Sequence, residues 1–200
     1  MINKDYWDNF YKLNIAPKEE SNFARFVLDY IVQNNQQDKK LIDIACGNGR
    51  DTFFFLKNKV ESAGIDISVK PDEDEQIFIK NDITTFDYEG YELMYLRFIV
   101  HALREEELDA LIKRLLKNSR LSTLFIETRS SKGITDEEKS ETFFKSSIGE
   151  EHFRMLYSKE YLVNKLSNYF DIIFVEENTG FSVYKGDDPV CIRFILKSRL

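Results

Sequence analysis

Three carboxylates stand near the ends of consecutive apolar segments in the first half of the chain. Asp43 lies in LIDIAC, Asp66 ends SAGID, and Asp82 follows IFIKN. Short apolar segments of this kind are typical of buried strands. Parallel strands end at one edge of a sheet, so the three carboxylates would lie along that edge, where α/β proteins bind ligands. Carboxylate oxygens there can accept hydrogen bonds from hydroxyl and amino groups and can bind a cationic centre.

A glycine turn follows the first of these segments. In LIDIACGNGRD, Gly47 and Gly49 are two positions apart, and a helix is predicted directly afterwards. A dinucleotide-binding turn needs a third glycine where this chain has Thr52, and Asp43 would repel a pyrophosphate. A P-loop is excluded because no GK[ST] follows. S-adenosylmethionine, which has a sulfonium and an ammonium group but no phosphate, fits better. A turn in which the glycines only relieve the backbone is the alternative without a ligand.

Basic side chains gather after the next two apolar segments, LMYLRFIV and LSTLFIETR, and in EEHFRMLY. The fourth and fifth strands end side by side in the expected topology, so their arginines would face one pocket. Arginine binds phosphate or carboxylate through two parallel hydrogen bonds. We expect an anionic acceptor there, with a histidine orienting it or acting as base if the acceptor is a hydroxyl. The candidates are Arg97, His101, Arg129, His152, Arg154 and Tyr157.

Each of these side chains also has an ordinary structural interpretation. His101 can be a buried histidine that bonds to the backbone, and Arg97 can pair with Glu127 in the core. The basic residues of EEHFRMLY can be plain loop residues. Cys46 fits the turn as a small side chain better than as a nucleophile. No His/Cys cluster has the spacing of metal ligands, so we expect no metal.

The elements between these groups predict an α/β fold. Strand segments alternate with helices, and the chain ends in two strands, DIIFVEENTGFSVY and PVCIRFILKSRL. This order predicts a Rossmann-like, mostly parallel seven-stranded sheet with a C-terminal antiparallel strand pair and helices on both faces. Ser21 and Ser158 are predicted N-caps. We expect a single domain over 1–200, with an N-terminal helical cap over 1–36 and an acceptor-side loop or lid over 129–157.

Composition excludes several classes of function. The 200 residues carry a net charge of −7, whereas nucleic-acid binders usually present a basic surface. No apolar run reaches membrane-spanning length, and MINKDYWDNFYK lacks the apolar core of a signal peptide. Cys46 and Cys191 are far apart, which favours free thiols in a reduced cytoplasm. We expect a cytoplasmic enzyme, with homodimer formation left open.

The segments LIDIACGNGRD, GIDIS and NDITTF together resemble the class I S-adenosylmethionine-dependent methyltransferases, and the resemblance covers the whole chain. YWDNFY, FARFV, YLRFIVHAL, IETRS, EEHFRM and DDPVCIRFI are similar to a bacterial branch associated with capsule and lipopolysaccharide biosynthesis. Some relatives in that branch methylate a terminal phosphate or related group on a surface glycan. The chain departs from many relatives at SVKPDED, where they have a full helix, and this leaves the adenine side more open.

The resemblance implies a set of cofactor-binding residues. Asp43 would stabilise the amino end of the cofactor, Asp66 would accept from both ribose hydroxyls, and Asp82 would accept from the adenine amino group. The backbone of Ala45 to Gly49 would approach the methionine part, and Arg25 would pair with its carboxylate. The N-terminal aromatic residues would cover the cofactor or simply pack a terminal helix. The set is Tyr6, Trp7, Tyr11, Arg25, Asp43, Ala45, Cys46, Gly47, Gly49, Asp66, Ile67, Asp82, Ile83 and Leu96.

The expected reaction is methyl transfer from S-adenosylmethionine, leaving S-adenosylhomocysteine. The resemblance favours O-methylation of a phosphate or phosphoramidate-type group of a capsular polysaccharide, another surface glycan or its precursor. Methylation of a sugar hydroxyl or a small-molecule amine is the first alternative. A non-catalytic S-adenosylmethionine-binding partner protein is the second, and a dinucleotide oxidoreductase ranks below both.

Overall fold

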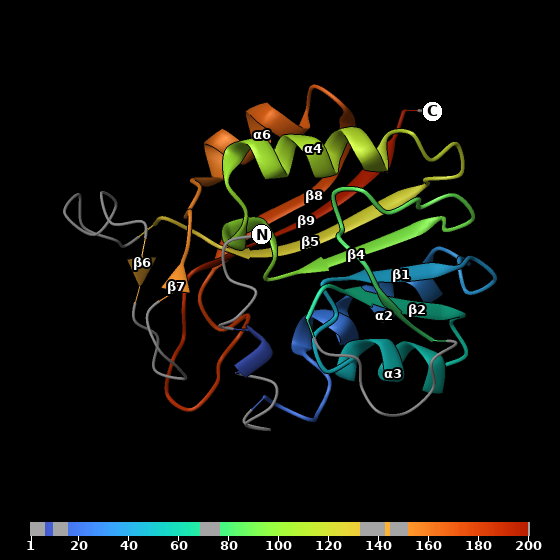
Figure 1. Cartoon of the computed structure of the whole chain (residues 1–200), viewed down its shortest axis with the longest axis horizontal. Helices are drawn as coiled ribbons and strands as arrows, with labels where there is room; N and C mark the ends of the chain where they lie inside the picture. Colours follow the sequence, from blue (N-terminus) through green and yellow to red (C-terminus); the bar gives the residue numbers. More distant parts are fainter. Residues whose placement is uncertain (1–6, 10–15, 69–76, 133–142, 145–151, 200) are drawn as a thin grey trace.

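Seven strands form one mixed sheet in the order β3-β2-β1-β4-β5-β9-β8 (Figure 1). The computed structural model describes residues 7–9, 16–68, 77–132, 143–144 and 152–199. The first five strands are parallel, and β9 pairs antiparallel with both β5 and β8. This confirms the predicted fold class. The strands are β1 (Leu41–Ile44), β2 (Ser62–Asp66), β3 (Phe78–Lys80), β4 (Leu93–Arg97), β5 (Thr123–Arg129), β8 (Phe170–Asn178) and β9 (Cys191–Ser198).

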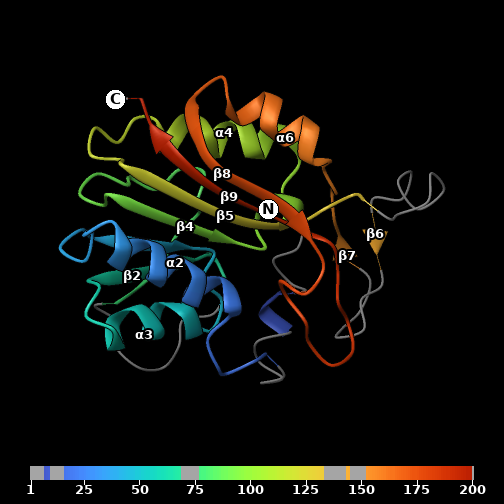
Figure 2. The ribbon, with the colours of Figure 1, turned by 180° about the vertical axis from the view of Figure 1, so that it is seen from behind.

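Helices cover both faces of the sheet. Figures 1 and 2 show α2 and α3 on one face and α4 and α6 on the other. The hydroxyls of Ser21 and Ser158 accept hydrogen bonds from the backbone of the first turns of α2 and α6, which confirms both predicted N-caps. The helices are α2 (Asn22–Gln33), α3 (Arg50–Lys57), α4 (Glu105–Leu115) and α6 (Lys159–Leu166), with a 3-10 turn η1 at Val100–Ala102.

Successive residues of the central strands pack into different cores. In β4, Leu93 and Tyr95 join the cluster on the α2 and α3 side, whereas Met94 and Leu96 join the cluster on the α4 and α6 side. Side chains alternate between faces along a strand, so a strand covered on both faces must be apolar throughout. Burying each large apolar side chain contributes about 1.5–3 kcal/mol. The two cores therefore hold the strand ends in fixed positions.

The acceptor-side segment contains two strands where the sequence predicted only a loop or lid. β6 (Phe143–Phe144) pairs antiparallel with β7 (His152–Phe153) in a separate two-stranded sheet. Two-residue strands are too short to show the alternation by which a strand is recognised. Residues 133–142 and 145–151 lie outside the described residues.

Two further expectations fall partly outside the described residues. The predicted N-terminal helix is described at 7–9, where it is helical, and Tyr6 and Tyr11 lie outside. The expected loop SVKPDED lies outside except for Ser68. None of the helices within the described ranges is long and apolar enough to cross a membrane.

Candidate active site

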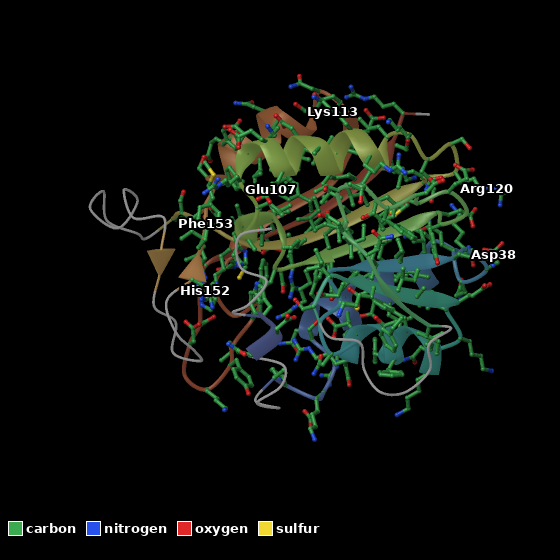
Figure 3. All side chains as sticks on the ribbon, in the orientation of Figure 1. Asp38, Glu107, Lys113, Arg120, His152 and Phe153 are labelled. Atoms are coloured by element: carbon green, nitrogen blue, oxygen red, sulfur yellow. The ribbon has the colours of Figure 1, made fainter. Side chains whose placement is uncertain are left out.

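A cavity of about 680 Å³ opens at the carboxyl edge of the parallel strands. Residues from the ends of β1, β2, β4 and β5 line it, together with residues 16–22 and the loop between β8 and β9. In Figure 3, His152 and Phe153 lie at this end of the molecule, whereas Asp38 and Arg120 lie at the opposite end. His152 is itself part of the lining. The cavity therefore occupies the position at which α/β sheets bind ligands.

The turn from β1 to α3 has left-handed backbone at three positions. Ala45, Gly47 and Gly49 have φ angles of 64°, 57° and 75°. Glycine adopts this conformation freely, whereas Ala45 is strained there, as residues at binding sites often are. The Asp66 carboxylate accepts hydrogen bonds from the backbone N–H of Gly47 at 2.9 Å and of Ser68 at 2.8 Å. These bonds tie the turn to the end of β2, and Ala45 and Cys46 line the cavity.

Asp43 is a buried carboxylate in the cavity wall. Its side chain accepts a hydrogen bond from the Thr52 hydroxyl at 2.7 Å, and only 3% of the residue is exposed. Burial, together with the negative charge of Asp51, raises the pKa of Asp43 to about 8. A cationic group placed beside Asp43 would favour its ionised form. The acidic side of the cavity, defined here by Asp43, Asp51 and Asp66, therefore suits a positively charged ligand.

Asp51 is a site residue that the sequence analysis did not identify. Its carboxylate accepts hydrogen bonds from Ser21 N at 2.7 Å, Ser21 Oγ at 2.8 Å and Tyr95 Oη at 2.7 Å. Asn48 Nδ2 donates to Pro17 O at 2.8 Å. These bonds fasten residues 16–22 across the acidic side of the cavity. From the sequence alone, an acid in the first turn of α3 is explained by its favourable interaction with the helix dipole. Its buried hydrogen-bond partners lie far away in sequence, so the sequence gives no sign of them.

Arg97 ends β4 and lies between a buried acid and the β8–β9 loop. Its Nε donates to Glu127 Oε1 at 3.0 Å, and its Nη2 donates to Ser182 Oγ at 2.8 Å. Glu127 also accepts from Arg193 Nε at 2.7 Å and is completely buried. The guanidinium of Arg97 lies 4.3 Å from the centre of the Phe98 ring. The pairing of Arg97 with Glu127, which the sequence left as an alternative, is thus what the structure shows.

Arg129 ends β5 beside Arg97. Its Nη2 donates to Asp187 Oδ2 at 2.7 Å, and its guanidinium lies 5.7 Å from the Phe98 ring centre. Phe98 has a φ angle of 59°, which is strained for a bulky side chain, and its N–H donates to Glu127 O at 2.8 Å. This bond holds Phe98 in the cavity wall, where its ring lies close to both guanidinium groups.

His101 is buried in the cavity wall behind these arginines. Its Nδ1 accepts a hydrogen bond from Arg129 N at 3.3 Å and lies 3.0 Å from Thr128 Oγ1. Because Nδ1 accepts from a backbone N–H, the network assigns the proton of the neutral ring to Nε2. Burial, followed by the positive charge of Arg154, lowers the pKa of His101 well below its usual range. His101 is therefore suited to donating a hydrogen bond and poorly suited to acting as a base.

His152 joins β7 to the N-terminal segment. Its Nε2 accepts from Arg154 Nε at 3.1 Å, and the Trp7 ring packs edge-on at a centroid distance of 5.6 Å. Trp7, His152 and Arg154 all line the cavity. The basic side, defined here by Arg97, His101, Arg129, His152 and Arg154, thus combines five of the six predicted acceptor-site residues.

Several predicted site residues lie elsewhere. The Arg25 side chain is 58% exposed and pairs with Glu20, and Arg25 is not part of the cavity lining, although Glu20 is. Tyr157 is buried and stacks on Tyr161 at a centroid distance of 5.1 Å, and Leu96 lies in the core. The Asp82 carboxylate accepts from the backbone and hydroxyl of Thr84, outside the lining. Ile67 and Ile83 do line the cavity.

The β8–β9 loop is a further part of the lining that the sequence analysis missed. The sequence of this loop contains no recognisable catalytic or binding motif, so nothing in it predicts that the loop lies at the carboxyl edge of the parallel strands. The described residues contain no group of three or more His, Cys, Asp or Glu that could hold a metal ion. The cavity-lining residues of this loop are Phe181, Ser182, Val183, Tyr184 and Asp187.

Comparison with solved structures finds S-adenosylmethionine-dependent methyltransferases. One from Anabaena variabilis shares 16% identity at a TM-score of 0.68, covering 100% of this chain and 96% of its own. The 1,6-didemethyltoxoflavin N1-methyltransferase of Burkholderia thailandensis, solved with 1,6-didemethyltoxoflavin and S-adenosylhomocysteine, shares 13% identity at 0.65, covering 88% and 78%. The glycopeptide N-methyltransferase MtfA, solved with S-adenosylhomocysteine, shares 12% identity at 0.65, covering 90% of each chain.

These likenesses show the fold. The chain has the Rossmann-like fold of the class I S-adenosylmethionine-dependent methyltransferases. No protein-family model matches the chain, and the comparison with curated protein sequences finds no match.

Proposed function

We propose that this protein is an S-adenosylmethionine-dependent methyltransferase. The observation that carries the proposal is one cavity with two oppositely charged sides, in a fold shared with enzymes of that activity. Asp43 and Asp66 lie at the ends of β1 and β2, whereas Arg97 and Arg129 lie at the ends of β4 and β5. A cationic methyl donor fits the first side, and an electron-rich acceptor fits the second.

The acidic side has residues for the ribose and for the ammonium group of the donor. Asp66 uses one lone pair of each carboxylate oxygen on the backbone, so both oxygens can still accept from ribose hydroxyls. Asp43 would lie beside the ammonium group, Ile83 beside the adenine ring, and Trp7 over the opening. When bound, S-adenosylmethionine supplies a methyl group on a positively charged sulfur, which leaves as a neutral thioether.

Calorimetry with separate ligands tests the donor. We expect S-adenosylmethionine and S-adenosylhomocysteine to bind and NAD to give no heat of binding. Binding of NAD in preference to S-adenosylmethionine would instead support an oxidoreductase. Binding of S-adenosylmethionine without turnover on any acceptor would support a non-catalytic partner protein.

We also propose that the acceptor is anionic, with a phosphate-type group on a surface glycan or its precursor as the specific candidate. The resemblance of the chain to the capsule-associated branch and the arginines of the basic side support this proposal. Arg97, Arg129 and Arg154 line the cavity, and Asp187 is the carboxylate on that side of the lining. Arginine recognises phosphate through two parallel hydrogen bonds. Product mass analysis after incubation with paired phosphorylated and unphosphorylated sugars tests it.

The aromatic lining favours a second candidate acceptor, a planar small molecule methylated on nitrogen. Phe98, Phe181 and Tyr184 line the basic side and offer ring faces for stacking. Two proteins of the same fold carry names of N-methyltransferases. The two candidates differ in charge. Arg129→Gln should reduce turnover of a phosphorylated acceptor strongly and that of a neutral heterocycle weakly.

A further inference from the structure

The loop between β8 and β9 lies along the basic side of the cavity, and its residues contact arginines there. Figures 1 and 2 show this loop at the same end of the sheet as β7 and residues 7–9. Two of the contacts occupy donors of the cavity-lining Arg97 and Arg129, and a third involves Arg193, which lies outside the lining. The contacts are Arg97 Nη2 to Ser182 Oγ at 2.8 Å, Arg129 Nη2 to Asp187 Oδ2 at 2.7 Å and Arg193 Nη2 to Phe181 O at 3.0 Å.

The two carboxylates that pair with these arginines differ in their ability to leave. Glu127 belongs to β5, is completely buried and lies between Arg97 and Arg193. Removing it would leave two buried cations without their partner, at a large cost. The Asp187 side chain is 30% exposed and belongs to a loop. An anion entering the cavity can therefore take the place of Asp187, but not that of Glu127.

The local backbone allows Asp187 to move as part of a small unit. Tyr184 and Asp187 exchange backbone hydrogen bonds in both directions at 2.9 Å, which holds the turn between them together. Gly180 and Gly186 have φ angles of 77° and 85°. Gly186 belongs to the turn itself, whereas Gly180 precedes it. Because glycine tolerates large changes of φ and ψ, Gly180 can absorb a displacement of the turn.

We propose that Asp187 is a specificity-determining residue: its carboxylate binds Arg129 in the place that the anionic group of the acceptor takes during turnover. This inference rests on the proposed function, because it concerns the acceptor of the same reaction. A neutral acceptor that displaced Asp187 would leave Arg129 without a charged partner. A singly charged carboxylate would make an even exchange. A phosphate monoester would bind Arg129 more strongly than the Asp187 carboxylate does, because it brings about two negative charges and three acceptor oxygens. The loop therefore selects doubly charged acceptors.

Phosphate binding measured without the methyl donor tests this competition directly. The rise of melting temperature with inorganic phosphate, at constant ionic strength, gives an apparent affinity for each variant. Asp187→Asn should bind phosphate about fivefold more tightly than the natural protein, because a partly exposed ion pair no longer competes. Acetate and glycerol, titrated in the same way, should show no comparable gain.

Asp188→Asn is the matched control. It removes the same charge from the same loop, and its side-chain oxygen can still accept from Gly180 N, as Asp188 does at 2.7 Å. Its phosphate affinity should stay that of the natural protein. Adding Arg129→Gln to Asp187→Asn should abolish the gain, because the released donor is then missing.

The outcomes separate this inference from the proposed function. Unchanged or weaker phosphate binding by Asp187→Asn would overturn it, because Asp187 would then only hold Arg129 in place. An equal gain in Asp188→Asn would overturn it as well, since net charge alone would explain the effect. Binding of S-adenosylmethionine is titrated separately. Its failure would refute the proposed function while the phosphate result still decides the competition at Arg129.

Discussion

The two sides of the cavity are built in different ways. On the acidic side, Asp66 binds Gly47 across 19 positions of the chain, and Asp43 binds Thr52 across nine. On the basic side, Arg129 binds Asp187 across 58 positions, and Arg97 binds Ser182 across 85. On the first side, these two bonds of Asp66 and Asp43 lie within one strand–helix–strand unit, whereas Asp51 bonds to Ser21 and Tyr95 outside that unit. The second needs the whole sheet to close before its charges meet.

Burial acts on the two sides with opposite results. It raises the pKa of Asp43 to about 8 on the acidic side and lowers the pKa of His101 well below its usual range on the basic side. Both shifts reflect the cost of charging a buried group. A cationic ligand would relieve the first, and an oxygen that accepts from His101 Nε2 suits the second. Burial thus favours the protonated form of Asp43 on one side of the cavity and the neutral form of His101 on the other.

Removing the buried acid behind the basic side should give the largest effect. Glu127→Ala should lower the free energy of unfolding by about 3 kcal/mol or more, because Arg97 and Arg193 lose their shared partner. Urea denaturation measures the change. Glu176→Ala, an exposed acid on β8, is the control and should stay within about 0.5 kcal/mol. A loss below about 1 kcal/mol for Glu127→Ala would mean that the basic side does not depend on it.

On the acidic side, the expected effect is on donor binding. Asp66→Ala should weaken S-adenosylmethionine binding about 100-fold, because two charge-assisted hydrogen bonds to the ribose are lost. Calorimetry measures the affinity, and phosphate binding at the basic side should stay the same. Asp87→Ala removes an exposed acid from the turn before β4 and should leave both affinities unchanged. An unaltered donor affinity in Asp66→Ala would remove Asp66 from the donor site.

Asp43 should make donor binding depend on pH. Its pKa of about 8 leaves it protonated near neutral pH, and a cationic donor binds its ionised form, so binding releases a proton. Affinity should rise up to about tenfold per pH unit as pH approaches about 8, and Asp43→Asn should flatten the rise. Calorimetry in buffers of different ionisation enthalpy measures the released proton. A proton uptake, or an unaltered slope in Asp43→Asn, would contradict the assignment.

The same raised pKa predicts how stability depends on pH without ligand. The folded chain keeps the Asp43 proton to a higher pH than the unfolded chain, whose Asp43 has its ordinary pKa near 3.8. The free energy of unfolding should therefore fall as pH rises from about 4 to about 8. In Asp43→Asn this contribution should be absent.

The smallest effect is expected at His101. With its Nδ1 accepting from Arg129 N and its pKa lowered, His101 should not ionise near neutral pH. With the donor saturating at every pH, the rate of methyl transfer should show no rising limb near the usual histidine pKa, and His101→Gln should lower the rate by less than about tenfold. A limb near neutral pH that disappears in His101→Ala would instead make His101 a general base.

Asp43 and Asp66 of the acidic side could be predicted because their signals are local, whereas Asp51 could not. Asp43, the glycine turn and Asp66 lie on one β1–α3–β2 unit, and strand ends in a parallel sheet share an edge. The sequence pattern cannot show whether the Arg25 side chain points toward a ligand. In the structure it is largely exposed and pairs with Glu20. Tyr157 is close to His152 in sequence, yet it is buried in the core and stacks on Tyr161.

The amino-acid sequence by itself determined the seven strands of the main sheet, the N-caps at Ser21 and Ser158, and the carboxylates at the ends of β1 and β2. These depend on periodicity and on interactions within a short stretch of chain. Only the tertiary structure decided that Arg129 meets Asp187, that Asp51 fastens residues 16–22, and that His101 lies neutral behind two arginines. Such partners lie tens of residues apart in sequence, and burial, which sets their charge states, exists only once the sheet has closed.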